Sequence, residues 1–488
     1  MARSFLSFTL ALATATLMLG LGAVPASAQP APPVTPSTTA PAAKTYPEVA
    51  EAFQKFGRSR NYKECIKDLE LVGRKYPELP SPYVLMYNFF NLKEVNQPNM
   101  ARLQLEQGIR VNPSDPEPWV MLGNIALQER RTAEATLDFE EAKKLLATYS
   151  NKERKAVLDQ QMMSGVAQLA EIVEDWKGAE AKLRELLTLA PRDLVAHQRL
   201  ARALFWQTKA GEAYTVLKEA KKIDHDDFAS GKKPREEFLT PEAIMAQYYL
   251  GFEGPKSEQP QTWFKAALVK APDDLTTRQV VAIWALESGK IDYARDQAEN
   301  ALRIEKEKKL TSSLVGRMLR GLVALWEKDW KGAQNYFEQV TLEAPNDFVA
   351  RNNLALALVE QDDADKKRRA LEYAQNNYTS NKQSPDALST LGWVYFRRNE
   401  FDQAGLALDQ AVKATNGQIN NADTATYLAH ILYHLDKKWQ AKEILDNIFK
   451  SERPFSMKPE AKILWEKVKD ATKPTEATPA PAAVPTKP

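Results

Sequence analysis

Apolar residues recur along most of this chain at the spacing of amphipathic helices, with polar residues between them. Two stretches repeat one order of side-chain sizes: large, large and small, then a polar turn, then small, large and small. The stretch 116–149 carries Trp119, Leu122, Gly123 and Ala126, then Ala135, Phe139 and Ala142. The stretch 386–416 carries Leu388, Leu391, Gly392 and Tyr395, then Ala404, Leu408 and Ala411. Each stretch therefore predicts a pair of helices.

Alignment on these positions places further helix pairs along the chain. Eleven pairs begin near residues 46, 82, 116, 160, 194, 241, 275, 314, 348, 385 and 422, and four of the ten steps are 34 residues long. Longer steps predict extended helices or inserted loops around 150–159, 226–240 and 307–313. Six pairs close on a proline, which ends a helix: Pro77, Pro113, Pro191, Pro272, Pro345 and Pro454.

This spacing of large and small residues resembles the tetratricopeptide repeat family, and the resemblance extends over roughly residues 46–455. It implies an all-α fold, a right-handed α-solenoid of about eleven tetratricopeptide-like helical hairpins. Residues 459–471, apolar on one side, are expected to form a C-terminal capping helix. We therefore expect one helical array over residues 46–471.

Small residues are expected where the two helices of a pair cross closely, because a large side chain would hold them apart. They are Gly123, Ala167, Ala201, Gly321 and Gly392 on first helices, and Ala101, Ala135, Ala179, Ala213, Ala294, Ala333, Ala404 and Ala441 on second helices. Cys65 stands at the equivalent place in the first pair, so we interpret it as a small buried side chain. Aromatic residues are expected to pack the hairpin turn where four second helices begin: Tyr62, Trp176, Trp330 and Phe401.

The two ends of the chain differ from the array in composition. Residues 1–28 have the features of a secretory signal peptide: Arg3, an apolar stretch over Phe5–Val24, and the cleavage pattern Ala26-Ser27-Ala28. An uncleaved membrane anchor is the alternative, because the stretch is of borderline length. Residues 29–45 and 472–488 are rich in Pro, Ala and Thr, and we expect both to be disordered. We expect an exported protein of bacterial type, periplasmic or at the cell surface.

Charge and catalytic motifs narrow the function. Lys and Arg (66) nearly balance Asp and Glu (64), which disfavours a nucleic-acid partner. The sequence has no Gly-x-Ser-x-Gly elbow and no phosphate-binding loop, so we predict a protein that is not an enzyme and needs no cofactor. His430 and His434 share one helix face and could hold a metal with Asp423 or Asp436, but a surface or partner-contact pair is favoured. We therefore predict no metal site.

The resemblance also implies a binding surface. In this family the first helices line a concave groove, and the corresponding positions here are Phe90, Asn124, Arg202, Phe205, Trp206, Tyr249, Phe252, Trp326, Trp393, Phe396, Arg397, His430, Tyr433 and His434. Aromatic and Arg side chains are enriched at the centres of protein interfaces. Any of these aromatics could instead fill gaps between successive pairs. Val120 and Met318 stand where a carboxylate-clamping lysine would be sought, which disfavours a chaperone cofactor.

We therefore predict a non-catalytic exported scaffold that binds a partner protein or an extended peptide in its groove. The stretches Asn352–Ala355 and Thr390–Tyr395 resemble bacterial envelope proteins with these repeats, which suggests a role in envelope, secretion or exopolysaccharide assembly. The alternative is a solenoid that binds polysaccharide or peptidoglycan, because aromatic faces can stack on sugar rings.

Overall fold

The computed structural model describes residues 46–92, 94–233, 238–254, 257–310, 312–415, 421–450 and 454–473. The predicted signal peptide and linker (1–45) and the tail beyond Lys473 lie outside these residues. The chain divides into two compact units between Tyr248 and Tyr249. We call residues 46–248 the N-terminal unit and residues 249–473 the C-terminal unit, and describe each separately.

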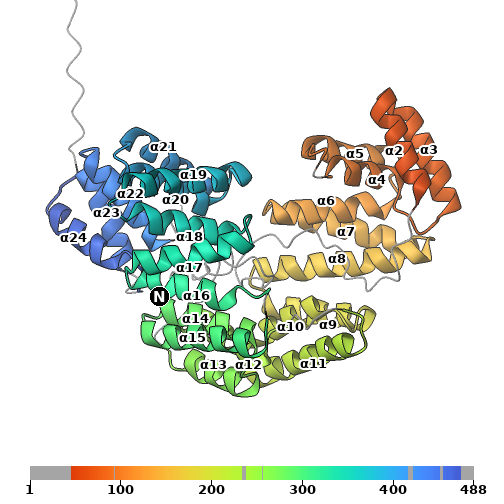
Figure 1. Ribbon diagram of the computed structural model, residues 1–488. Coiled ribbons are helices and arrows are strands. Elements are labelled where there is room, and N and C mark those ends of the chain that lie inside the picture. Colours follow the sequence, from red (N-terminus) through yellow and green to blue (C-terminus); the bar gives the residue numbers. More distant parts are fainter. Residues whose placement is uncertain are drawn as a thin grey trace, which may run out of the picture. The chain divides into compact units, whose positions relative to one another are not determined.

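The described part of the chain contains helices and no strand, and Figure 1 shows the helices as successive pairs. Ten helices belong wholly to the N-terminal unit: α2 (Pro47–Ser59), α3 (Tyr62–Lys75), α4 (Pro82–Phe90), α5 (Pro98–Val111), α6 (Pro116–Gln128), α7 (Thr132–Thr148), α8 (Lys152–Ile172), α9 (Trp176–Leu189), α10 (Leu194–Trp206) and α11 (Ala210–Ala229). Helix α12 (Pro241–Glu253) contains the division between the units.

The C-terminal unit continues the alternation of first and second helices and ends on one unpaired helix. Its helices are α13 (Gln259–Lys270), α14 (Leu275–Glu287), α15 (Ile291–Glu307), α16 (Val315–Trp326), α17 (Trp330–Glu343), α18 (Phe348–Val359), α19 (Ala364–Ser380), α20 (Pro385–Arg397), α21 (Phe401–Ala414), α22 (Ala422–His434), α23 (Lys438–Phe449) and α24 (Lys458–Val468). The order confirms the all-α array of eleven helix pairs followed by a C-terminal helix.

Short polar caps and prolines set the start of the first helices. Asp193 and Asp347 each accept a hydrogen bond from the backbone N–H three residues later, at Ala196 and Ala350. Pro116 and Pro385 occupy the first helical position, where a missing N–H costs nothing. Ten of the eleven predicted starts are therefore correct to within one residue. The exception is α8, which begins at Lys152 instead of 160, because Asn151 caps a helix that extends back through the expected insertion.

The small residues lie where the helices of a pair meet, as the sequence predicts. A Cβ on Gly123 would stand 2.7 Å from the ring of Phe139, and one on Gly321 would stand 2.7 Å from the ring of Phe337. All eight predicted alanines on second helices are fully buried. Because interiors are packed as densely as organic crystals, these contacts leave no room for a larger side chain.

The remaining predictions on the hairpins also agree with the structure. Tyr62, Trp176, Trp330 and Phe401 are the first residues of α3, α9, α17 and α21. Cys65 is buried, with Sγ 3.6 Å from Sδ of Met86, and burial raises the pKa of its thiol to about 11. No helix in the described residues is both long enough and apolar enough to cross a bilayer.

Candidate functional site

Four of the predicted groove residues are buried and pack between helix pairs. Phe90 stacks on Tyr62 of the preceding pair, with ring centroids 6.2 Å apart. Phe205 packs on Tyr248 at 5.4 Å. Trp393 is 3% exposed and, like Phe396, belongs to the core. These rings join successive pairs and offer little surface to a partner, which is the packing alternative raised from the sequence.

The first helices α8 and α10 of the N-terminal unit are joined by an ionic cluster. Glu171 pairs with Arg199 at 2.9 Å and with Arg202 at 2.5 Å. Arg199 also donates to the side chain and the carbonyl oxygen of Ser164. Arg202 is thus held by a neighbouring first helix, while Asn124, on α6, is half-buried.

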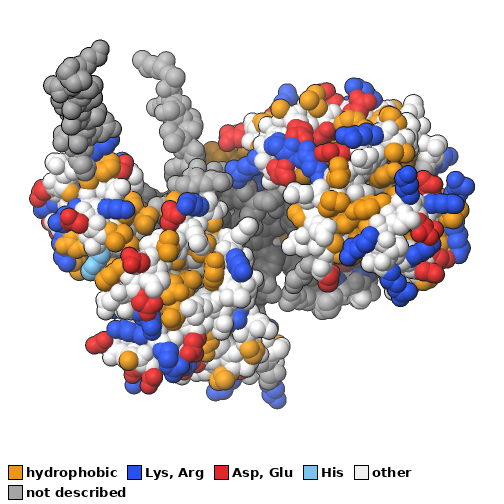
Figure 2. All heavy atoms as spheres, turned by 90° about the horizontal axis from the view of Figure 1, so that it is seen from above, with side chains coloured by type: hydrophobic (Ala, Val, Ile, Leu, Met, Phe, Trp, Pro, Cys, Tyr) orange, Lys and Arg blue, Asp and Glu red, His pale blue; other side chains and the backbone are white. Residues whose placement is uncertain are grey.

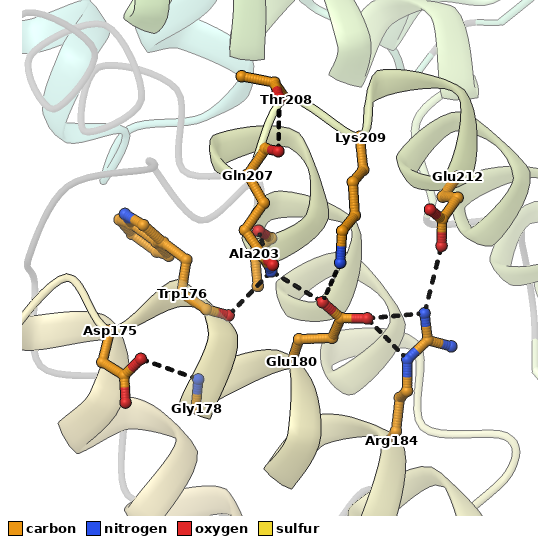
Figure 3. Close-up of polar contacts among 10 residues, drawn as sticks. All are labelled: Asp175, Trp176, Gly178, Glu180, Arg184, Ala203, Gln207, Thr208, Lys209 and Glu212. Carbon is orange, nitrogen blue, oxygen red and sulfur yellow. Dashed lines mark hydrogen bonds and ion pairs between the residues drawn. The ribbon is translucent and has the colours of Figure 1, made fainter.

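The turn between α8 and α9 is fastened to the next hairpin by one glutamine (Figure 3). Nε2 of Gln207 donates to the carbonyl oxygen of Trp176 at 3.1 Å and to Glu180 at 2.9 Å. Lys209 donates to the same carboxylate at 2.8 Å and, with Gln207 and Arg184, lowers the pKa of Glu180 to about 2.

The aromatic residue before this glutamine completes the junction. The indole of Trp206 stacks on that of Trp176, with ring centroids 5.7 Å apart. Asp175 caps α9 by accepting a hydrogen bond from the N–H of Gly178 at 2.9 Å (Figure 3). Trp206 is thus a half-buried ring whose one face is covered by the preceding hairpin.

The C-terminal unit contains a second copy of this turn. Residues 175–179 and 329–333 are both Asp-Trp-Lys-Gly-Ala, and Asp329 caps α17 through the N–H of Gly332 at 2.9 Å. Gln361 donates to the carbonyl oxygen of Trp330 at 3.5 Å and to Gln334 at 2.8 Å. The glutamine and the cap are therefore in the same arrangement in both units.

The position before the glutamine differs between the two copies, because Glu360 replaces the tryptophan. Its carboxylate accepts a hydrogen bond from Nε1 of Trp393 at 2.6 Å and pairs with Arg397 at 3.2 Å. Burial raises the pKa of Glu360, and the charge of Arg397 opposes that rise. The guanidinium of Arg397 also lies over the Trp393 ring, 5.9 Å from its centroid.

The two predicted histidines lie against this cluster. His430 packs edge-on to Trp393, its Nε2 is buried without a hydrogen-bond partner, and burial lowers its pKa to about 4. His434 is exposed and stacks on Phe401 with ring centroids 4.8 Å apart. The described residues contain no group of three or more His, Cys, Asp or Glu that could hold a metal ion.

The remaining predicted residues are more accessible. Phe252 is 49% exposed, and Trp326 and Tyr433 are half-buried. Tyr249 is half-buried and stacks on Trp263 at 6.3 Å. With Trp206, Arg202 and Arg397, these side chains define what we call the first-helix surface, which is the accessible part of the predicted groove in each unit.

The sequence did not reveal that the C-terminal segment packs beside this surface, with Lys467 over the ring of Tyr433. We define the C-terminal segment as residues 454–468, which include α24. Asp423, in the first turn of α22, accepts hydrogen bonds from the N–H of Met457 at 2.8 Å and from the hydroxyl of Ser456 at 2.9 Å. Lys328, in the turn between α16 and α17, pairs with Glu460 at 3.1 Å.

The C-terminal segment thus reaches well beyond the last helix pair. Pro454 lies 3.1 Å from the place that a Cβ on Gly289 would occupy, in the turn between α14 and α15. Trp465 donates to Asp446 on α23 at 2.8 Å. The C-terminal segment, whose helix was predicted only to cap the array, therefore also contacts turns that lie three and four pairs earlier in the chain.

Charge does not mark a binding site on the face that Figure 2 shows. Figure 2 shows Lys and Arg side chains interspersed with Asp and Glu and with hydrophobic side chains on the visible face.

Paired helices, small residues at their crossings and recurrent 34-residue steps define a helical repeat protein with the tetratricopeptide type of fold. No protein-family model matches the sequence, and no curated protein matches it. Among solved structures, the chain is similar to a tetratricopeptide repeat protein from Parabacteroides merdae, with 14% identity and a TM-score of 0.37, over 56% of this chain and 99% of that chain.

Two further solved structures are similar at the same identity. Pseudomonas aeruginosa PilF is 14% identical with a TM-score of 0.33, over 49% of this chain and 100% of that chain. Yeast Tom70 is 14% identical with a TM-score of 0.36, over 86% of this chain and 95% of that chain. These likenesses concern the fold.

Proposed function

We propose that this chain is an exported, non-catalytic scaffold whose first-helix surface binds a polypeptide segment of a partner protein. One observation carries the proposal: the C-terminal unit already holds a polypeptide segment, that of the chain itself, beside this surface and in contact with Tyr433. Asp423 accepts hydrogen bonds from the segment's backbone and side chain, and Lys328 pairs with its Glu460. A surface that binds one amphipathic segment has the chemistry to bind another.

The stacking of the predicted groove aromatics on neighbouring rings favours a polypeptide partner over a polysaccharide. A sugar needs an open aromatic face, but one face of Trp206 is covered by Trp176, and Trp393 is stacked on both Phe396 and Tyr427. Buried carboxylates and half-buried rings suit backbone N–H groups and apolar side chains instead. The polysaccharide alternative therefore gains no support from these contacts.

The described titratable groups support a non-catalytic role. A cysteine nucleophile acts as its thiolate, and the raised pKa of Cys65 keeps the thiol protonated at neutral pH. The lowered pKa of His430 keeps it neutral, but its free Nε2 is buried among aromatic rings, where no substrate proton can reach it.

Export rests on the sequence of residues 1–28 and an envelope role on the stretches Asn352–Ala355 and Thr390–Tyr395, and both are part of the proposal. Sequencing the N-terminus of the protein recovered from outside the cytoplasm should give Gln29 as the first residue. Recovery of a chain that still begins at Met1 in the membrane fraction would support the anchor instead.

Partner binding is tested by capture from the native envelope with single substitutions. Trp206→Ala and Trp326→Ala remove half-buried rings of the first-helix surface, and Leu137→Ala and Leu342→Ala remove exposed side chains of second helices as matched controls. We expect the tryptophan variants to lose at least about tenfold in bound partner, because interface energy concentrates in such anchors. Circular dichroism should show all four variants folded. Equal capture by all four would refute the assignment of the surface.

A further inference from the structure

Asp423 differs from the carboxylate at the equivalent place in the N-terminal unit. Glu117, in the first turn of α6, is buried and pairs with Arg154 of α8 at 2.6 Å. It also accepts a hydrogen bond from the N–H of Ser81 at 2.9 Å. Both partners belong to neighbouring helix pairs, so the array itself satisfies Glu117.

The side chain of Asp423 receives its two hydrogen bonds from the C-terminal segment alone. One donor is the backbone N–H of Met457, the residue that caps the start of α24. The positive end of the α24 dipole therefore faces this carboxylate, and the hydrogen bond from Met457 opposes the rise in its pKa that burial causes. Asp423 is thus a binding residue for the start of a helix.

Lys328 supplies the second point of attachment. Its Nζ lies 3.1 Å from Glu460 and 3.6 Å from Sδ of Met457. The same ammonium lies over the ring of Trp330, 5.2 Å from its centroid. Asp423 and Lys328 therefore recognise a helix start and a carboxylate in its first turn.

The C-terminal segment is amphipathic, and its apolar side faces the array. Its buried apolar side chains are Phe455, Met457, Ala461, Leu464 and Val468, whereas Ile463 on the other side is 62% exposed. Lys467 lies over the ring of Tyr433, 5.9 Å from its centroid. The contact therefore has an apolar centre with polar contacts at both ends.

The helical form of α24 depends on its docking. An isolated helix of its 11 residues is marginal in water, so α24 is helical because it is docked. It competes as a tethered ligand, with an effective concentration in the millimolar range. A free segment of similar chemistry must bind tightly enough to displace α24, or must bind a chain from which α24 has already been released.

We propose that the C-terminal segment is a built-in competitor for the partner site of the C-terminal unit. The site takes an amphipathic helix from another protein, with a free helix start for Asp423, a carboxylate in its first turn for Lys328, and an apolar face. Release of α24 opens the site, and docking of α24 closes it. This inference rests on the proposed function and names the partner segment and its regulation.

The test uses the full chain and a labelled peptide of residues 454–473 as the probe. Leu464→Asp disrupts the apolar face of the chain's own segment without altering the surface beneath it, and Ala461→Asp is a second variant of the same kind. Hydrogen exchange should show faster exchange of α24 amides in both variants. Both should bind the peptide at least about tenfold more tightly than the unaltered chain, because the tethered competitor is gone.

A charge reversal identifies where the peptide binds. Lys328→Glu, added to Leu464→Asp, should weaken peptide binding, and a peptide carrying Glu460→Lys should restore it. Ile463→Asp, on the exposed side of α24, is the matched control and should leave peptide binding at the level of the unaltered chain.

Two outcomes would overturn the inference. In the first, α24 amides stay protected in both release variants, which would make the segment a fixed part of the array. In the second, α24 is released but the peptide binds no more tightly. Capture by the Trp206 and Trp326 variants separates this inference from the proposed function: if they lose partner and the peptide result fails, only the competitor role is wrong.

Discussion

The two Asp-Trp-Lys-Gly-Ala turns, one in each unit, share their fastening and differ in what lies beside it. In both, an aspartate caps the second helix and a glutamine donates to the tryptophan carbonyl. Beside the glutamine, however, Trp206 stacks on Trp176, whereas Glu360 binds Trp393 and Arg397. The turn therefore has the same structure in both units, which we call the shared frame. The residue before the glutamine determines which side chains lie beside it.

This difference changes which side chains lie beside each turn. The aromatic stack closes the junction in the N-terminal unit with apolar surface. In the C-terminal unit, Glu360 replaces the second ring of the stack, and Lys328 lies over the Trp330 ring and reaches Glu460 of the C-terminal segment. One substitution in the frame thus accompanies a surface that binds a helix.

The largest effect is expected at the core of the shared frame. Phe337 and Leu183 occupy the same position in the two copies, and both are fully buried. Phe337→Ala should lower the free energy of local unfolding by about 3–5 kcal/mol and Leu183→Ala by about 2–5 kcal/mol, because each leaves a cavity. Hydrogen exchange of α17 and α9 measures both, with Leu342→Ala, 80% exposed, as the control. A loss near that of the control in either unit would contradict a shared frame.

A pH effect should distinguish the C-terminal unit. His430 has a pKa of about 4 in the folded chain, below the usual 6.5, so the unfolded chain binds more protons between these values. Stability from this group is present above pH 6.5 and is lost as pH falls towards 4, by up to about 3 kcal/mol. Its charged neighbours are Glu460 and His434, with Lys467 and Arg397.

The variant His430→Gln isolates this effect. The raised pKa values of Glu360 and Asp423 act in the opposite sense, so the comparison is between the variant and the unaltered chain and not between two pH values alone. Measured by urea unfolding, the stability of the C-terminal unit should fall less between pH 7 and pH 5 in the variant than in the unaltered chain. Equal pH slopes would show that His430 is not held neutral by its surroundings.

A smaller effect tests the glutamine in each copy. Gln207→Ala and Gln361→Ala should each lower local stability by about 1 kcal/mol, because the tryptophan carbonyl loses a donor. Replacement of each glutamine by glutamate should destabilise the two junctions by different amounts. Gln207→Glu places a charge beside Glu180, whereas Gln361→Glu faces the neutral Gln334. Thermal unfolding should show the larger loss for Gln207→Glu, and equal losses would mean that the two junctions are not differentiated by charge.

Local signals predicted most of the fold. Caps such as Asp193 and Asp347, and the small residues Gly123 and Gly321, act within one helix pair, so their spacing in the sequence reports on the structure directly. The predicted start of the fourth helix pair falls at 160 instead of Lys152, because the first turn of α8, Lys152–Lys155, is entirely charged and depends on the cap at Asn151.

The candidate site was less predictable, since it depends on contacts between distant parts of the chain. The spacing placed Trp393 on a first helix, but its burial comes from Tyr427 and His430 of the next pair. In the sequence Asp423 is only an acidic residue in the first turn of a helix, whereas in the structure it accepts a hydrogen bond from the N–H of Met457. Neither contact follows from the repeated spacing of large and small residues in the sequence.

The central claim is that the first-helix surface binds a partner polypeptide, and site-specific photo-cross-linking tests it most directly. A photoreactive amino acid placed at Trp326 of the full chain, in its native envelope, should form a cross-link to a distinct partner protein. The same group at Leu342, on a second helix, should form none. A cross-link of equal yield at Leu342, or none at Trp326 while the partner is still captured, would contradict the account.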